Sequence, residues 1–122
     1  MTTQLHGLRT AIYPVVDLVA ATAWWRNLTG IDPYFEEPFY VGFNIGGYEL
    51  GLLPDANIDD GVQVYWGVDD VEGAVAAAVD LGASTLSPAA DVGDGIITAT
   101  VRTPQGNVLG YIFNPHFSTD AP

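Results

Sequence analysis

The sequence predicts an α+β fold made of two tandem copies of a strand–helix–three-strand (βαβββ) unit. The first observation is that residues 8–30 read as a short strand, an Asp-capped apolar helix and a glycine stop, and that residues 62–82 repeat this order. The second is that a shift of 53 residues aligns Asp17 with Asp70. Apolar residues that align downstream are spaced by three and seven, which is the spacing of one helical face.

The first copy covers about residues 8–54. Its opening strand ends at Pro14, which cannot donate a hydrogen bond to a neighbouring strand. Asp17 is then placed as the N-cap of a helix, and Gly30 is placed as its left-handed end. The helix is expected to bury one apolar face in the core, formed by Leu18, Ala21, Trp24, Trp25 and Leu28.

Short strands follow this helix. Short strand-like runs separated by turn-forming residues predict them over residues 34–36, 39–45 and 49–53. Gly46 and Gly47 separate the last two and predict a tight hairpin. Residues 54–61 (PDANIDDG) are polar and rich in turn formers, so they are predicted to link the two copies.

The second copy covers about residues 62–117. It is predicted to contain a strand over 62–68, an alanine-rich helix capped by Asp69 or Asp70, and a helix stop at Gly82. A short strand over 84–87, a loop over 88–95 and strands over 96–102 and 107–113 complete it. Because each helix has one apolar face, we expect curved mixed sheets around a cleft with the helices outside, in a single domain over residues 1–122.

The composition limits the kinds of partner. The chain has no cysteine, 15 Asp and Glu, three Arg and no Lys, which gives a net charge of −12. Such a charge repels phosphate backbones and anionic lipids and attracts cations, so nucleic-acid and membrane partners are not expected. There is no apolar run long enough to span a membrane and no signal-peptide pattern at the start, so a cytoplasmic location is expected.

Three segments carry a family resemblance: VVDLVAATAWWRNLTG, VDDVEGAVAAAVDLGA and TPQGNVLGYIFNPHF. With them the chain resembles the vicinal oxygen chelate superfamily, which includes glyoxalase, bleomycin resistance and dioxygenase proteins, over about residues 8–117. The resemblance implies a homodimer, in some members with exchanged halves. It also implies, for the enzymes of the family, a divalent metal held by side chains from four strands.

The family pattern places one metal ligand on the first strand of each repeat and one on the last strand of each repeat, four in all. In this chain the resemblance puts them at Thr10, Gly51, Gln63 and Gly110. Glycine offers no side-chain ligand, and a hydroxyl and a neutral amide hold a divalent ion weakly. We therefore expect no metal and no other cofactor.

Gly51 and Gly110, the glycines at two of these four positions, would leave space in the middle of the cleft. Glu49 shares a strand face with Gly51 and is expected to act as a ligand-binding group or base, or to be solvated. The candidate ligand-binding residues are Thr10, Ile12, Phe43, Glu49, Gly51, Gln63, Tyr65, Gly110 and Ile112. Further aromatic candidates are Phe39 or Tyr40, Trp66 and Tyr111. The alternative is that these side chains form ordinary core.

Two functions remain open at this point. The first is a metal-free protein that binds a small amphipathic or cationic molecule, in the manner of drug-sequestering resistance proteins. The second is a lyase, isomerase or dioxygenase with a displaced or absent metal. Glu49 with Gln63 and one histidine is its best constellation, and no residue is assigned a catalytic role. The expected partners are the small molecule and a second copy of the chain.

Overall fold

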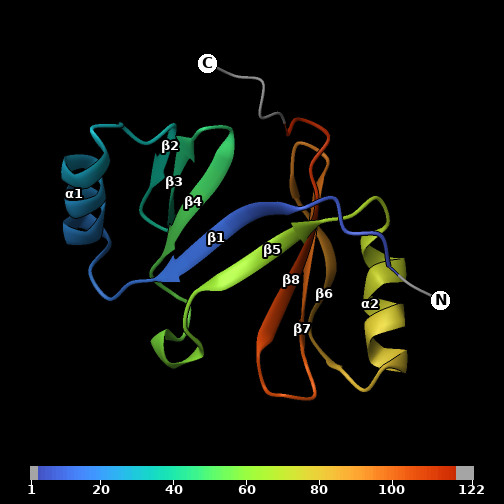
Figure 1. Ribbon diagram of the computed structural model, residues 1–122. Helices are drawn as coiled ribbons and strands as arrows, with labels where there is room; N and C mark the ends of the chain where they lie inside the picture. The colour runs from blue at the N-terminus through green and yellow to red at the C-terminus, as the bar shows by residue number, and fades with distance from the viewer. Residues whose placement is uncertain (1–2, 118–122) are drawn as a thin grey trace. The chain divides into compact units, whose positions relative to one another are not determined.

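The computed structural model describes residues 3–117, and the order of its elements confirms the predicted βαβββ–βαβββ pattern (Figure 1). The strands are β1 (Leu8–Pro14), β2 (Phe35–Glu37), β3 (Tyr40–Ile45), β4 (Tyr48–Leu53), β5 (Gln63–Gly67), β6 (Ser84–Gly93), β7 (Ile96–Arg102) and β8 (Val108–Phe113). The helices are α1 (Leu18–Thr29) and α2 (Val71–Asp80), and a 3₁₀ turn, η1, covers Ile58–Asp60. The described residues form two compact units: the repeat-1 unit (residues 10–63) and the repeat-2 unit (residues 3–9 and 64–117).

The repeat-1 unit is a mixed sheet with the strand order β2-β3-β4-β1. β3 is antiparallel to both β2 and β4, and β1 runs parallel to β4. Gly46 and Gly47 both have positive φ, 64° and 93°, which confirms the predicted tight hairpin between β3 and β4. α1 packs on one face of this sheet (Figure 1), over a core of Val41, Phe43, Leu50 and Leu52.

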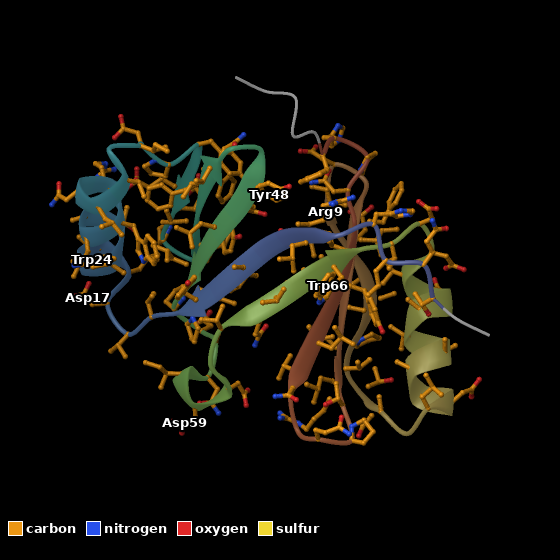
Figure 2. The ribbon with its side chains drawn as sticks, in the orientation of Figure 1. Arg9, Asp17, Trp24, Tyr48, Asp59 and Trp66 are labelled. Carbon is orange, nitrogen blue, oxygen red and sulfur yellow. The ribbon has the colours of Figure 1, made fainter. Side chains whose placement is uncertain are left out.

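The ends of α1 form as the sequence predicts. The Asp17 side chain accepts a hydrogen bond from the Ala20 backbone N–H (3.0 Å), and Gly30 closes the helix with a left-handed φ of 70°. The predicted buried face was too wide, because Trp24 and Leu28 are 59% and 61% exposed. The other three predicted residues, Leu18, Ala21 and Trp25, pack against the core. Trp24 (labelled in Figure 2) is edge-on to Trp25, with ring centroids 5.2 Å apart.

The repeat-2 unit repeats this arrangement with the strand order β5-β8-β7-β6, β5 lying parallel to β8. Asp70, rather than Asp69, caps α2 by accepting from the Gly73 N–H at 3.0 Å. Below the helix the core contains Val68, Val71, Ala74, Ala99, Val101 and Tyr111. The segment before β1 belongs to this unit, because the His6 N–H donates to the Gly67 carbonyl and the Gly67 N–H donates to the Gly7 carbonyl (2.8 and 2.9 Å).

One strand of the repeat-2 unit is longer than predicted. β6 extends from Ser84 to Gly93, through most of the segment expected to be a loop. Its pairing with β7 shifts register at three places, which lets an edge strand include Pro88 and hides its alternation from the sequence. No helix in the described part of the chain is long and apolar enough to cross a membrane.

Candidate functional site

Polar side chains gather on the face of the repeat-1 sheet that is turned away from α1. The strand register places Thr10 beside Glu49, and Gly42 beside Gly51. Alternation along the strands puts these residues on the face opposite the core, whose members are their sequence neighbours. Glu49 lies at the centre of this face. It is the one acidic residue in strands β1, β3 and β4.

Three hydroxyl groups hold the Glu49 carboxylate. The hydroxyls of Tyr34 and Tyr40 donate to Glu49 Oε2 at 2.6 and 3.0 Å, and the Thr10 hydroxyl donates to Oε1 at 3.4 Å. We call these four residues the Glu49 cluster. Across residues 3–117, no Arg or His forms an ion pair with Glu49. The donors are neutral, so the carboxylate is fixed in place while its negative charge is not compensated by a cation.

The Tyr34 side chain links this carboxylate to solvent. It is 62% exposed as a whole, but its hydroxyl lies against Glu49. Burial of the phenol, the hydrogen bond to Glu49 and the negative charge of Glu49 all raise the pKa of Tyr34 above its ordinary value of 10.0. At neutral pH, Tyr34 is therefore a protonated hydrogen-bond donor.

Tyrosine rings cover both glycines at the positions where the family pattern expects metal ligands. A Cβ built on Gly51 would collide with the hydroxyl of Tyr40, and one built on Gly110 would lie 2.6 Å from Tyr65 Cδ2. The space predicted at these glycines is thus filled from within each unit. Two glycines, a threonine and a neutral amide do not fit a divalent metal, and nowhere in residues 3–117 do three or more His, Asp or Glu gather as a metal site.

The structure separates the other predicted residues. Ile12 lies opposite Gly51 and shares the face of the repeat-1 sheet that is turned away from α1, which we call the open face. Phe43 does not: it is 0% exposed in the core under α1, because the side-chain alternation of β3 is shifted by one residue from the expected one. Gln63 is the first residue of β5.

The remaining candidates lie in the repeat-2 unit. Tyr65 pairs with Gly110, and Gly67 pairs with Ile112, so these four residues share the sheet face opposite α2. Burial raises the pKa of Tyr65. Trp66 and Tyr111 alternate to the other face, and Tyr111 belongs to the core. Of the two aromatic alternatives at the start of β3, Tyr40 reaches the site, whereas Phe39 lies in the turn before the strand.

Sequence reasoning missed Tyr34, although a signal for it exists. The Tyr34 N–H donates to the Gly42 carbonyl at 3.0 Å, so the residue continues the edge of the sheet just before β2. A Cβ on Gly42 would lie 2.9 Å from Glu49 Oε2 and 3.0 Å from a Tyr34 ring carbon. Glycines within neighbouring strands mark places where another group approaches the backbone closely.

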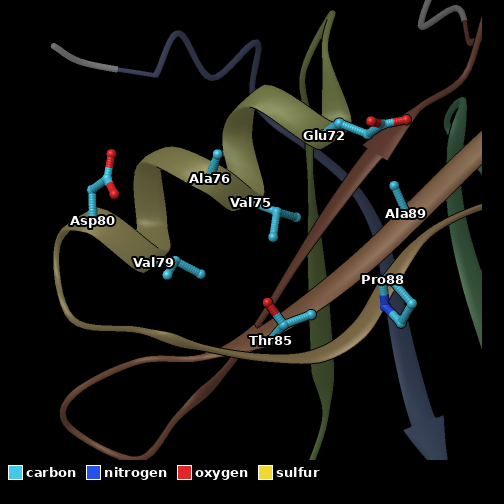
Figure 3. A pocket seen from close by; sticks show the side chains of 8 residues that line it. All are labelled: Glu72, Val75, Ala76, Val79, Asp80, Thr85, Pro88 and Ala89. Atoms are coloured by element: carbon cyan, nitrogen blue, oxygen red, sulfur yellow. The ribbon is translucent and has the colours of Figure 1, made fainter.

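A groove lies between α2 and β6 in the repeat-2 unit, which contains no residue of the Glu49 cluster (Figure 3). It is a groove of about 590 Å³ with apolar walls that include Val75, Val79 and Ala89. Its charged groups, Glu72 and Asp80, are both acidic. None of the residues predicted to bind a ligand lines it.

Comparison with solved structures shows a shared fold. Methylmalonyl-CoA epimerase from Streptomyces coelicolor, in complex with 2-nitronate-propionyl-CoA, aligns with a TM-score of 0.74 at 18% identity over 98% of this chain and 100% of that one. A glyoxalase/bleomycin resistance protein/dioxygenase superfamily member from Vibrio splendidus aligns at 0.65 and 18% over 92% and 98%. A protein described as NAD-dependent benzaldehyde dehydrogenase, from Legionella pneumophila, aligns at 0.65 and 19% over 85% and 96%.

The matching family model and these structures together show the fold of the glyoxalase/bleomycin resistance/dioxygenase (vicinal oxygen chelate) superfamily. The family model described as a glyoxalase-like domain matches residues 11–110, and the chain belongs to this family. A search of functionally curated proteins found no significant match.

Proposed function

We propose that this protein binds a small amphipathic or cationic molecule at the Glu49 cluster and does so without a metal. The observation that supports the proposal is the Glu49 carboxylate, which three neutral hydroxyls hold in place and which no cationic side chain among residues 3–117 neutralises. A fixed anion of this kind is complementary to a ligand ammonium group, because the cost of orienting the carboxylate is already met by the fold.

The surroundings of Glu49 suit the rest of such a ligand. The rings of Tyr34 and Tyr40 converge on one carboxylate oxygen, and aromatic faces attract cations as well as apolar groups. The net charge of −12 adds a long-range field that raises the local concentration of cations. The covered glycines support the metal-free part of the proposal, since tyrosine rings occupy the positions of two ligands.

Calorimetric titration with benzyltrimethylammonium tests this proposal, with benzyl alcohol as the neutral probe. We expect saturable binding of the cation, and about tenfold weaker binding in Glu49→Gln, since one charge-assisted contact contributes roughly 1.5–3 kcal/mol. Glu37→Gln is the matched control, because it removes the same charge from exposed β2 of the same unit. Equal affinity of the cation for both variants, or equal binding of benzyl alcohol, would contradict a site at Glu49.

The competing function is a lyase, isomerase or dioxygenase of the same superfamily, in which Glu49 would be the base. Thermal unfolding with added Zn²⁺, Ni²⁺, Mn²⁺ or Fe²⁺ separates the two. The binding proposal expects no saturable stabilisation by any of these ions. A large stabilisation that disappears in Gln63→Ala or Glu49→Gln would favour the metal enzyme.

We also propose that the protein forms a homodimer, as the family resemblance implies. Trp24 and Leu28 are apolar side chains of α1 that are exposed to solvent. They support the proposal because a second copy of the chain could cover them in an interface. Sedimentation equilibrium should give the mass of two chains, and a mass near the 13.0 kDa of one chain would contradict it.

A further inference from the structure

We infer that Arg9 forms a binding site for an oxyanion, a carboxylate or phosphate group, on the face of the repeat-2 sheet that α2 does not cover. The site is distinct from the Glu49 cluster and has the opposite charge. It consists of the Arg9 guanidinium, the strand residue Gly67 beneath it and the ring of Phe117.

Two neighbours hold the guanidinium against the sheet. A Cβ built on Gly67 would lie 2.7, 2.8 and 3.0 Å from Arg9 Nε, Cζ and Nη2, so these three atoms lie nearly flat over the Gly67 backbone. The Phe117 ring centroid is 3.8 Å from Cζ, a cation–π distance. The side chain is therefore oriented before any ligand binds, which reduces the entropy that binding would cost.

The hydrogen bonds of Arg9 use one end of the group. Nη1 donates to the backbone carbonyls of His6 (3.3 Å) and Leu8 (3.2 Å). Nε and Nη2 have no acceptor within residues 3–117. These two N–H groups form the edge of the guanidinium that matches both oxygens of a carboxylate or phosphate.

The charge environment makes this open edge unusual. The chain has 15 acidic residues and three arginines, yet Arg9 pairs with no carboxylate in the described part of the chain. Arg26, in contrast, bonds Asp32 at 2.9 Å and lies 3.6 Å from Glu36. The nearby Asp69 is engaged with His6, whose Nε2 lies 3.1 Å from its Oδ1. Since no carboxylate of residues 3–117 binds this edge of Arg9, an external oxyanion is a suitable partner for it.

Nuclear magnetic resonance of the arginine Nε–H groups tests the inference directly. The full chain has three arginines, so three side-chain Nε–H signals are expected and single substitutions assign them. Titration with benzoate, and separately with inorganic phosphate, should move the Arg9 signal saturably. The Arg26 signal should stay in place, because its Nε already donates to Asp32. An Arg9 signal that neither anion moves would overturn the inference.

Two variants separate the shape of the site from its charge. Arg9→Lys keeps the charge but loses the paired donors, and about tenfold weaker benzoate binding is expected. Gly67→Ala keeps the arginine but displaces its guanidinium, whose flexible end can move without unfolding the strand, and a similar loss is expected. Arg26→Lys is the matched control. If Arg26→Lys weakens binding as much as Arg9→Lys does, the effect is general charge and the site is absent.

Discussion

The two repeats build the same frame and place opposite chemistry on it. Each ends in a strand with a glycine, Gly51 or Gly110, that a tyrosine ring covers. In the repeat-1 unit the ring belongs to Tyr40, whose hydroxyl binds Glu49 and so leaves a fixed negative charge on the open face. In the repeat-2 unit the ring belongs to Tyr65, and the corresponding face carries a positively charged group, Arg9, over Gly67.

The difference shows how one glycine position is filled in two ways. In the repeat-1 sheet, Ile12 lies opposite Gly51 on β1, and the ring reaches the glycine from β3 instead. In the repeat-2 sheet, Tyr65 lies directly opposite Gly110 on the parallel strand β5. An aromatic ring across a strand glycine restores the packing that the missing side chain would have provided. The repeats share this packing solution, whereas the polar groups around it are free to differ.

The largest expected effect tests this packing. A Cβ on Gly110 would meet Tyr65 at Cγ and Cδ2 (2.7 and 2.6 Å), near the root of the ring, whereas one on Gly51 would meet the hydroxyl end of Tyr40. The end of a side chain moves more easily than its root. We expect Gly110→Ala to lower the free energy of unfolding by about 3 kcal/mol and Gly51→Ala by about 1 kcal/mol, measured by urea denaturation.

A second substitution serves as the control for this pair. Tyr65→Val removes the colliding ring, so the double variant Gly110→Ala/Tyr65→Val should be destabilised by less than the sum of the single changes. Additive effects, or equal costs for Gly51→Ala and Gly110→Ala, would mean that the tyrosines do not set the limit at these glycines.

The next effect asks whether the two helices begin in equivalent ways. Asp17 and Asp70 each accept one backbone N–H at 3.0 Å, so Asp17→Ala and Asp70→Ala should each cost about 1 kcal/mol of unfolding free energy. Asp69→Ala is the control, because it removes the same charge one residue before the cap, and its contact with His6 is solvent-exposed and contributes little. Its cost should stay below about 0.5 kcal/mol. A larger loss for Asp69→Ala than for Asp70→Ala would contradict the assigned cap.

Local signals explain why the order of elements could be predicted. Asp17, Gly30 and the Gly46–Gly47 pair each act on the backbone next to them, and the structure confirms all three. The errors arose where distant contacts decide the outcome. Register shifts against β7 lengthen β6, and packing against the sheet selects Trp25 over Trp24.

The Glu49 cluster shows the same limit at the level of the site. Glu49 and Thr10 could be nominated from strand alternation, and their register places them side by side. The sequence could not exclude Phe43 from the candidate site. A shift of the strand alternation by one residue moves a side chain from the open face to the core, where Phe43 lies. Tyr34 was missed because its role depends on Gly42, which lies in strand β3, eight positions later in the chain. Gly42 has no side chain and so leaves room for both Tyr34 and Glu49.

The smallest expected effect concerns three tyrosines whose pKa is raised in the folded protein. Burial and Glu49 raise the pKa of Tyr34, and burial raises that of Tyr65 and Tyr111. The folded state therefore keeps protons that the unfolded chain begins to lose near pH 10. This contribution is fully present below pH 10 and is lost as the pH rises through the higher folded values.

Urea denaturation at pH 8 and pH 11 measures this loss for each unit. Tyr34→Phe should reduce the alkaline loss by on the order of 0.5 kcal/mol, the lower range for one hydrogen bond, because Tyr34 is largely exposed. The rest of the loss of unfolding free energy between pH 8 and pH 11 should remain in this variant, because Tyr65 and Tyr111 are unchanged. Because Glu49 contributes to the raised pKa of Tyr34, Tyr34→Phe should have less effect in the Glu49→Gln background. The same effect in both backgrounds would show that burial alone, as at Tyr65, governs the Tyr34 phenol.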